Sequence, residues 1–366
     1  MSIDYLKGLN SLRFFAAFFV IISHGQMSLR NLGVVGEQPY AIFERGGDGV
    51  EFFFTLSGFL ITYLLIRELE SRKDISLKKF YLRRVFRIWP LYFLIVAIGF
   101  IFLGVVYPRI THESFFNFKI VDGLALFLFF VPNIATSLYA TGLMYPLWSI
   151  GVEEQYYLFW APCIKLFRGN VLPFILFFLI ISYAFYFVGY NNYFNVDERW
   201  LKFFKTLKFY AMAMGGLFAY IYAYKKAWFE RSVFSNSIVQ AIVLGILVYH
   251  FFIGFPFSWM LWFHLILSVL FALVIINVIL PRSIIKLEIQ PFTYLGVISY
   301  GLYMYHMSVD YFLRFFCMKY LKVGLFNSNV VAIVYQVCLF GMTILIAGLS
   351  YKYLESYFLR LKQKFA

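Results

Sequence analysis

The stretch from Leu9 to Gly25 constrains this chain more than any other, because it is an apolar run that carries one arginine, Arg13, and one histidine, His24. An α-helix turns by about 100° per residue, so His24 lies within roughly 20° of Arg13 and about 16 Å further along the axis. Charged groups inside a membrane helix are costly and usually face a protein-lined cavity. The pair therefore predicts a polar path through a membrane. A simpler alternative places Arg13 at the inner headgroups and His24 at the outer interface.

The composition agrees with a membrane protein, because 62% of the 366 residues are hydrophobic and the mean hydropathy is +0.78. The 32 Lys and Arg residues outnumber the 18 Asp and Glu residues, but they occur in short clusters between apolar runs, as orientation by loop charge requires. No basic domain stands apart from the membrane, so we expect no nucleic-acid partner. Cys163, Cys317 and Cys338 have no CxxC or His-paired spacing, so we expect neither a disulfide framework nor a metal site.

The chain contains ten apolar segments that are long enough to cross about 30 Å of hydrocarbon. The sequence thus predicts an all-α fold, a polytopic membrane helical bundle with about ten transmembrane helices. The predicted spans are 9–25, 50–66, 88–106, 147–164, 171–190, 207–223, 238–253, 258–280, 294–316 and 331–351.

A further apolar segment, 121–134, is short and contains Pro132 and Asn133. The segment 67–87 holds eight Lys and Arg residues, which is the strongest cytoplasmic signal in the chain. The later basic clusters also face the cytoplasm only if 121–134 does not cross. We therefore expect 121–134 to be re-entrant or interfacial on the outer side, and both the N- and C-termini to be cytoplasmic.

The second predicted span opens with the segment 49–61, GVEFFFTLSGFLI. Glu51 stands near the outer helix start, where the helix dipole favours a carboxylate. Ser57 and Gly58 let another helix or a ligand approach the backbone closely. No nucleophile elbow surrounds Ser57, so we do not expect it to be a covalent nucleophile.

Three arginines, Arg83, Arg84 and Arg87, precede the third predicted span. On a helix, residues three and four apart are neighbours, so these guanidiniums can converge at the cytoplasmic mouth of a cavity. Such a cluster suits a polyphosphate. A topology anchor bound to anionic lipid is an equally good explanation.

Glu153 and Glu154 lie about two turns into the fourth predicted span. Each must be paired, hydrated or protonated, and only one can face a cavity squarely. A carboxylate near the outer end could orient His24 or bind a hydroxyl group. In the ninth span, Ser299, Tyr303 and His306 share one helical face. His250 and His264 are expected to be hydrogen-bonded interior histidines.

Taken together, five motifs resemble those of the acyltransferase-3 family of membrane O-acyltransferases, and they stand in the family's order over nearly the whole chain. One departure is Glu355-Ser356-Tyr357, where a proline often follows the glutamate. The motifs are Arg13 and His24 with ten residues between them, GVxxFFxLSGFLI at 49–61, RRxxRIxP at 83–90, WSxxxEExYY at 148–157 and SYxLYxxH at 299–306.

The resemblance implies a bacterial inner-membrane enzyme. It would move an acyl group, usually acetyl, from cytoplasmic acyl-CoA to a hydroxyl of an extracytoplasmic glycan such as O-antigen, lipopolysaccharide or exopolysaccharide. We expect residues 1–366 to form a single acyltransferase-3 transmembrane domain without an SGNH extension. The expected partners are acyl-CoA as donor substrate, a glycan or lipid-linked oligosaccharide as acceptor, and membrane lipid, with no permanently bound cofactor. The alternative is a transporter or flippase for a lipid-linked sugar, which also needs buried charge and a central path.

For such a reaction, we expect the following roles for the residues singled out above. His24 is expected to be catalytic, either as a general base or as a transient acyl carrier, with Glu153 or Glu154 in support. The acyl-CoA-binding residues are expected to be Arg13, Arg83, Arg84 and Arg87. The residues expected to line or support the tunnel are Glu51, Ser57, Trp148, Ser149, Ser299, Tyr303 and His306.

Overall fold

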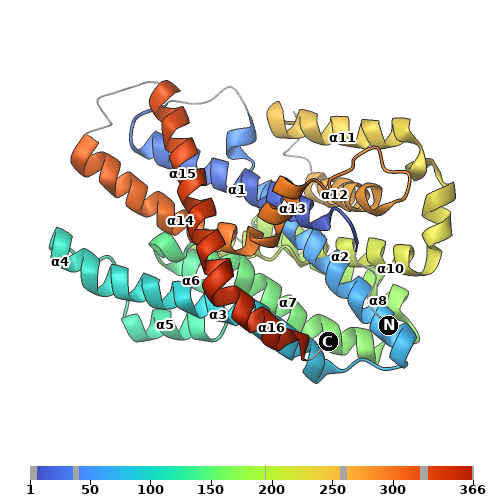
Figure 1. Cartoon of the computed structure of the whole chain (residues 1–366). Coiled ribbons are helices and arrows are strands. Elements are labelled where there is room, and N and C mark those ends of the chain that lie inside the picture. Colours follow the sequence, from blue (N-terminus) through green and yellow to red (C-terminus); the bar gives the residue numbers. More distant parts are fainter. Residues whose placement is uncertain (1–5, 36–40, 194, 256–261, 322–328, 365–366) are drawn as a thin grey trace.

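The structure is a computed structural model that describes residues 6–35, 41–193, 195–255, 262–321 and 329–364. Its regular secondary structure is entirely helical, with no strand in these ranges (Figure 1). The principal helices are α1 (Leu9–Asn31), α2 (Gly46–Arg72), α3 (Leu77–Ile101), α4 (Tyr107–Thr111), α5 (Ile120–Leu128), α6 (Pro132–Leu138), α7 (Leu147–Leu166), α8 (Val171–Tyr190), α9 (Glu198–Thr206), α10 (Phe209–Arg231), α11 (Ser237–Phe252), α12 (Phe263–Ile279), α13 (Gln290–Val297), α14 (Ser299–Phe316), α15 (Asn329–Ser350) and α16 (Ser356–Gln363).

The predicted all-α fold is confirmed, and each predicted span overlaps helix within the described ranges. The span 294–316 is divided at Ile298 between α13 and α14. Residues 258–261 of the span 258–280 lie outside the described residues. Five helical stretches are long and apolar enough to cross a membrane, whereas α11 and α12 are apolar but shorter. Length and composition therefore support five spans directly, fewer than the ten expected. The five stretches are Leu9–Asn31, Gly46–Arg72, Leu77–Thr111, Val171–Tyr190 and Asn329–Leu361.

Helices α1 and α2 form the centre of the bundle and run in opposite directions. A Cβ added to Gly46 would lie 2.9 Å from the side chain of Ser23, and one added to Gly49 would lie 2.8 Å from the carbonyl oxygen of Ala16. Residue numbers therefore fall along α1 in the direction in which they rise along α2. Around this pair, α1 contacts α13, α14 and α15, while α2 contacts α7, α10 and α12.

The close approach predicted at Ser57-Gly58 is made by α10. A Cβ on Gly58 would lie 1.9 Å from the carbonyl oxygen of Met212, and a Cβ on Gly215 would lie 1.9 Å from that of Thr55. A side chain at either glycine would therefore collide with the backbone of the other helix. This contact of small residues is typical of helix packing inside membranes.

Helices α2 and α7 run in the same direction. Ser57 hydrogen-bonds to Tyr157, and one turn further along both helices Trp160 Nε1 donates to Thr62 Oγ1 at 2.9 Å. The predicted non-crossing segment 121–134 falls on α5 and α6, which have 9 and 7 residues. At 1.5 Å per residue, neither helix can span about 30 Å of hydrocarbon. Only one long helix, α3, therefore separates α2 from α7.

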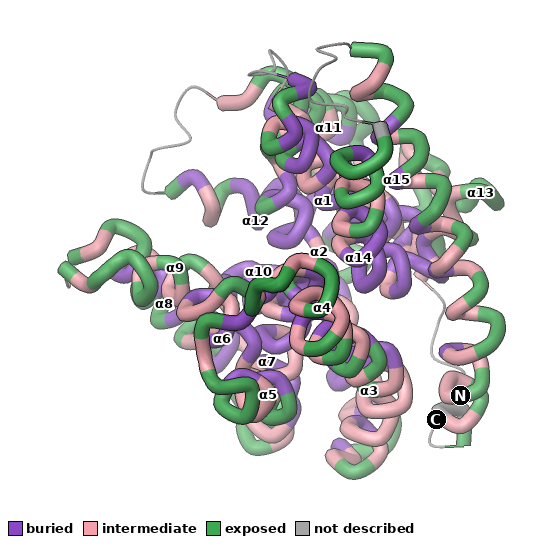
Figure 2. The backbone as a smooth tube through the Cα atoms, turned by 90° about the vertical axis from the view of Figure 1, so that its left-hand side faces the viewer, coloured by how far each residue is buried: buried purple, intermediate pink, exposed green. Residues whose placement is uncertain are grey.

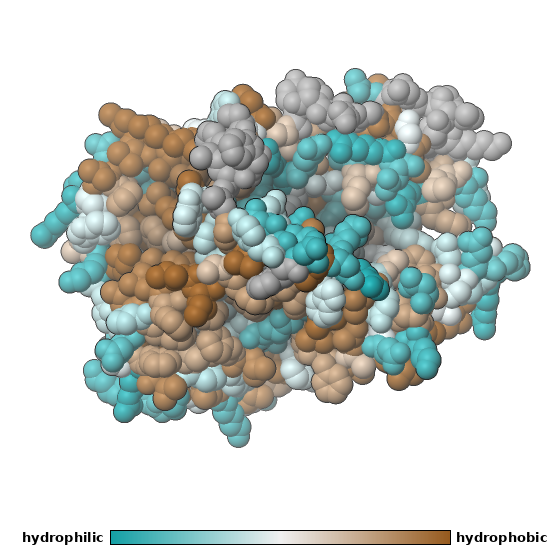
Figure 3. All heavy atoms as spheres, turned by 180° about the vertical axis from the view of Figure 1, so that it is seen from behind, coloured by the Kyte–Doolittle hydropathy of each residue, from teal (hydrophilic) through white to brown (hydrophobic). Residues whose placement is uncertain are grey.

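The surface of the bundle is rich in large apolar side chains, as membrane lipid would require. Phe129, Leu158 and Ile180 have exposed fractions of 79%, 68% and 69%. Figure 2 shows buried residues gathered on α1, α7 and α12, with exposed residues along α4 and α5. Figure 3 shows broad hydrophobic areas on one face of the molecule.

One end of α7 is tied to the loop between α2 and α3. Lys165 Nζ donates to Asp74 Oδ2 at 2.9 Å and to the carbonyl oxygen of Ile75 at 2.9 Å. The hydrogen bond from Lys165 lowers the pKa of the Asp74 carboxyl. The contact joins two of the basic segments that the sequence assigns to the cytoplasm.

Candidate functional site

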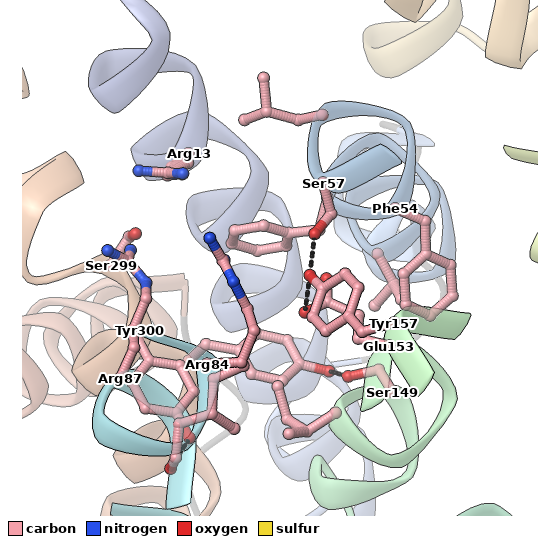
Figure 4. A pocket seen from close by; sticks show the side chains of 16 residues that line it. Arg13, Phe54, Ser57, Arg84, Arg87, Ser149, Glu153, Tyr157, Ser299 and Tyr300 are labelled. Carbon is pink, nitrogen blue, oxygen red and sulfur yellow. Dashed lines mark hydrogen bonds between the residues drawn. The ribbon is translucent and has the colours of Figure 1, made fainter. Parts of the chain in front are cut away.

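A narrow cavity of about 90 Å³ lies between α1, α2, α3, α7 and α14, and three guanidiniums reach it (Figure 4). Arg13 comes from α1, and Arg84 and Arg87 come from neighbouring positions on α3. The carboxylate among the lining residues is that of Glu153. We call this space the inner cavity; its other polar lining residues are Ser57, Ser149, Tyr157, Ser299, Tyr300 and Tyr303.

The Arg84 side chain is held in place by aromatic rings rather than by carboxylates. Its guanidinium carbon lies 5.8 Å from the ring centre of Phe80 and 5.7 Å from that of Tyr157. The Nε atom of Arg84 is buried and has no hydrogen-bond partner among the described residues. Arg13 donates from Nη1 to Asn10 Oδ1 at 3.1 Å, which is a neutral partner. These arginines keep donors and charge available for a ligand.

Glu153 is hydrogen-bonded within the inner cavity. Tyr157 donates its hydroxyl hydrogen to Glu153 Oε2 at 3.1 Å, and Ser57 hydrogen-bonds to the same hydroxyl (Figure 4). Because Tyr157 uses its one hydrogen on Glu153, Ser57 is the donor of the second bond. The chain of bonds fixes one wall of the inner cavity, between α2 and α7.

His24 faces a second pocket of about 390 Å³, which we call the outer pocket. Its walls come from α1, the short helix Ala41–Glu44, the starts of α2 and α7 with the residues before α7, and α14. They include the aromatic rings of Phe43, Tyr145 and Trp148, together with an ion pair in which Arg30 Nη2 lies 2.7 Å from Glu44 Oε1. Aromatic faces beside a polar pair suit an amphipathic ligand with hydroxyl groups.

The inner cavity and the outer pocket share two lining residues, Val50 and Tyr303. The hydroxyl of Tyr303 lies 2.8 Å from Ser149 Oγ. Arg13 and His24 therefore open into adjoining spaces, as the helical spacing of the sequence predicts.

The ring of His24 is hydrogen-bonded to His306, with Nδ1 of His24 2.9 Å from Nε2 of His306. His306 is fully buried, and its Nδ1 lies 2.5 Å from the carbonyl oxygen of Tyr303. One turn further along both helices, Ser28 donates to Asp310 Oδ2 at 2.6 Å. The two contacts join α1 to α14, which run in the same direction.

The structure brings most of the predicted site residues to these two spaces. Arg13, Ser57, Arg84, Arg87, Ser149, Glu153, Ser299 and Tyr303 line the inner cavity; His24 and Trp148 line the outer pocket, which Tyr303 also lines; His306 stands behind His24.

Three predicted site residues, Arg83, Glu154 and Glu51, lie away from both spaces. Arg83, expected with the other arginines, forms an ion pair with Glu68, whose Oε2 is 3.1 Å from Arg83 Nη2. Glu154 points away from the inner cavity and accepts from Trp89 Nε1 at 3.3 Å. In the described part of the chain, neither Glu153 nor Glu154 hydrogen-bonds to His24, whose ring partner is His306.

Glu51, expected to line or support the tunnel, lines neither space and belongs to a buried network on the opposite side of α2. Its carboxylate lies 2.9 Å from Lys208 Nζ and 2.9 Å from His264 Nδ1, and it accepts from Ser268 at 2.9 Å and from Tyr210 at 3.2 Å. His250 is fully buried, with Nε2 3.0 Å from Asp48 Oδ2. The prediction that His250 and His264 are hydrogen-bonded interior histidines is thus confirmed.

Tyr157, Tyr145 and the Arg30–Glu44 pair also belong to these spaces, although no role was expected for them from the sequence. The spacing of four residues from Glu153 to Tyr157 could have indicated the hydrogen bond between them. Tyr145 lies three residues before the motif at 148–157. No local pattern links Arg30 to Glu44, because the chain between them leaves one helix and enters another.

Known proteins resemble this chain over most of its length. The sequence profile of the acyltransferase-3 family, described as an acyltransferase domain, matches residues 6–352. The chain is 23% identical over 371 residues to the peptidoglycan O-acetyltransferase OatA of Listeria monocytogenes, with 96% of this chain and 55% of the relative covered. It is 26% identical over 374 residues to the O-acetyltransferase OatA of Staphylococcus aureus, with 96% and 57% covered.

The chain thus spans about half the length of the curated relatives it matches. No solved structure matches it.

Proposed function

Because the chain belongs to the acyltransferase-3 family, we propose that it is a membrane O-acyltransferase. It takes an acyl group, acetyl by analogy with the names of its relatives, from cytoplasmic acyl-CoA. It places this group on a hydroxyl of a cell-surface glycan at the outer side of a bacterial inner membrane. Acyl-CoA is a donor substrate and not a permanently bound cofactor.

The observation that carries this proposal is the unbalanced charge of the inner cavity. Three guanidiniums face it and one carboxylate lines it, which leaves an excess of positive charge within a membrane protein. Buried charge without a counter-charge is costly. An anionic ligand removes that cost, and guanidiniums are well suited to phosphate groups. The diphosphate and phosphate of CoA are such anions.

His24 stands where the chemistry would occur. A CoA held by Arg84 and Arg87 would extend its thin pantetheine arm past Arg13 towards Val50 and Tyr303, where the inner cavity meets the outer pocket. His24 then acts on the acceptor hydroxyl as a general base or carries the acyl group transiently. Glu153, tied to Tyr157 and Ser57, offsets part of the arginine charge in the inner cavity.

The outer pocket is the proposed acceptor site. Its aromatic rings can pack against the apolar face of a sugar, while Arg30 and Glu44 can hydrogen-bond to hydroxyl groups. One relative is named a peptidoglycan O-acetyltransferase, so the acceptor class includes cell-wall glycan as well as O-antigen or a related surface polysaccharide.

The proposed topology has ten spans with both termini in the cytoplasm. The common direction of α2 and α7, with α3 as the single long helix between them, supports an outer position for 121–134. The basic residues around the α2–α3 loop and at the end of α7 then share the cytoplasmic side. The arginines of the inner cavity face the compartment that contains acyl-CoA.

The alternative function is a transporter or flippase for a lipid-linked sugar, which would also need buried charge and a path. Such proteins are commonly built from two related halves around a central site. The sequence contains no internal repeat that would correspond to two such halves.

The test is thioester turnover by the purified protein in lipid nanodiscs. We expect the wild type to release CoA slowly from acetyl-CoA, and faster when a soluble muropeptide or oligosaccharide acceptor is added. His24→Gln should bind acetyl-CoA and lose turnover by about 10²–10⁴-fold, the usual contribution of a general base. The matched control is His112→Asn, because His112 is exposed and has φ 61°, a conformation that asparagine tolerates. A wild type that neither binds nor cleaves acetyl-CoA would overturn the proposal in favour of transport.

A further inference from the structure

The two nitrogens of the His24 ring have different surroundings, and only one can face the reacting groups. We infer that His306 is a positioning residue, which holds the proton of neutral His24 on Nδ1 and leaves the lone pair of Nε2 directed to the outer pocket. This inference rests on the proposed function for its chemistry, but its geometry does not depend on which glycan is the acceptor.

The Nδ1 atom of His306 lies 2.5 Å from the backbone carbonyl oxygen of Tyr303. A carbonyl oxygen can only accept a hydrogen bond. The Nδ1 atom of His306 must therefore carry a hydrogen and donate it.

The surroundings of His306 also determine its charge. The residue is fully buried, and in the described part of the chain neither its ring nor that of His24 has a carboxylate as hydrogen-bond partner. An imidazolium buried without a counter-charge is costly. His306 is therefore neutral, and since its hydrogen is on Nδ1, its Nε2 atom is an acceptor.

The tautomer of His306 determines that of His24. The Nε2 acceptor of His306 lies 2.9 Å from Nδ1 of His24, so His24 is the donor. In neutral His24 the remaining nitrogen, Nε2, then holds a lone pair. Within the described ranges no side chain or backbone group hydrogen-bonds to that Nε2, and the residue lines the outer pocket.

The two rings are held firmly in this arrangement. Their centres are 5.0 Å apart with an angle of 25° between the planes. The Ser28–Asp310 bond at 2.6 Å fixes the same pair of helices one turn further along, and Tyr335 donates to Asp310 Oδ1 at 2.8 Å. Rotation or sliding of α1 against α14 would break both the His24–His306 bond and the Ser28–Asp310 bond.

In this tautomer, His24 can take up and return a proton through Nε2 during the proposed transfer. His24 Nε2 takes the proton of the acceptor hydroxyl as its oxygen bonds to the thioester carbonyl carbon. The carbon–sulfur bond then breaks, and the CoA sulfur leaves with that proton, which restores neutral His24. Throughout, His24 Nδ1 donates its hydrogen bond to His306 Nε2. As the acceptor of this bond, His306 stabilises the transient imidazolium of His24. Transfer through an acyl group on His24 would need the same free Nε2 atom.

Two substitutions of similar size separate a positioning role from a packing role. His306→Gln can place a carboxamide oxygen near the former Nε2 position and so keep an acceptor for His24. His306→Asn is too short to reach His24, although its amide can still donate to the Tyr303 carbonyl. We expect the glutamine variant to keep kcat within about tenfold of wild type and the asparagine variant to lose about 10²–10⁴-fold, with unchanged KM for acetyl-CoA in both.

The direct readout is the ring ¹⁵N spectrum of histidine-labelled protein in nanodiscs. The chain has five histidines, and the His24 signals are identified by their loss in His24→Gln. We expect a protonated Nδ1 and an unprotonated Nε2 for His24 in wild type and His306→Gln, and a mixture of tautomers in His306→Asn.

The outcomes separate this inference from the proposed function. A wild type without acetyl-CoA turnover rejects the proposed function, while the spectrum still tests the tautomer. A wild-type His24 protonated on Nε2, or equal kcat losses in the two variants, overturns the inference even when the enzyme is active.

Discussion

Replacement of Arg84 by glutamine should weaken acetyl-CoA binding by about 10- to 140-fold. The guanidinium lies against the rings of Phe80 and Tyr157, so the side chain is already ordered when the ligand arrives. Its buried Nε has no hydrogen-bond partner in the part of the chain that the structure describes. A hydrogen bond to a charged group contributes about 1.5–3 kcal/mol. At 1.4 kcal/mol per tenfold change in Kd, this range gives the expected loss.

The neighbouring arginine supplies the control for this prediction. Arg83 is paired with Glu68 at 3.1 Å and does not line the inner cavity. Arg83→Gln removes the same charge from the same region of the protein, so a general effect of charge would appear in both variants. We expect Arg83→Gln to change the Kd by less than about threefold, because the charge it removes is already paired.

The assay is isothermal titration of both variants with acetyl-CoA and with acetyl-pantetheine, which lacks the nucleotide and its phosphates. Arg84→Gln should weaken acetyl-CoA binding and leave acetyl-pantetheine binding unchanged. Equal losses in Arg83→Gln and Arg84→Gln would refute the assignment of the inner cavity as the phosphate site. Equal losses for both ligands would instead place Arg84 against the pantetheine arm.

Three further predictions concern packing and passage. Lys208→Met should destabilise the protein by about 3–5 kcal/mol, because it leaves the Glu51 carboxylate buried without its ammonium partner. In thermal unfolding, the double variant Glu51→Gln/Lys208→Met should recover part of the lost stability, and no recovery would contradict the pairing. Gly58→Ala should cost about 1–3 kcal/mol through its collision with Met212, whereas Gly245→Ala, with open space around its Cβ, should stabilise α11 by about 1 kcal/mol; equal melting temperatures would argue against the α2–α10 contact. Val50→Phe should abolish acetyl transfer while acetyl-CoA still binds, because Val50 lines both the inner cavity and the outer pocket; undiminished transfer would show that the acyl group takes another route.

Sequence reasoning succeeded where one helix decides the outcome. The period of the helix placed Arg13 and His24 on one face of α1, and the structure finds them in adjoining spaces. The same period grouped Ser299, Tyr303 and His306 on α14, and all three lie at or behind those spaces. These relations depend on covalent geometry within one element, which the sequence contains in full.

Sequence reasoning was less able to choose between adjacent residues, because that choice depends on how a helix is rotated against its neighbours. Arg83 and Arg84 have the same side chain, but Glu68 on α2 holds the first while the second reaches the inner cavity. Glu51 was expected to line or support the tunnel from its place near the helix start, yet its partners come from α10 and α12, more than 150 residues along the chain. Such partners follow from packing and are not visible in a local pattern.

The placement of the hydrogen bonds favours group transfer over transport. A transporter must open its central site to each side in turn. Here the wall between the inner cavity and the outer pocket is tied together, with Tyr303 bonded to Ser149 of α7 and His306 joining α14 to α1. A whole sugar could pass only if these bonds broke, whereas an acyl group needs only a gap beside Val50 and Tyr303. In the proposed reaction, the bonds that position His24 would thus also keep the acceptor on one side and CoA on the other.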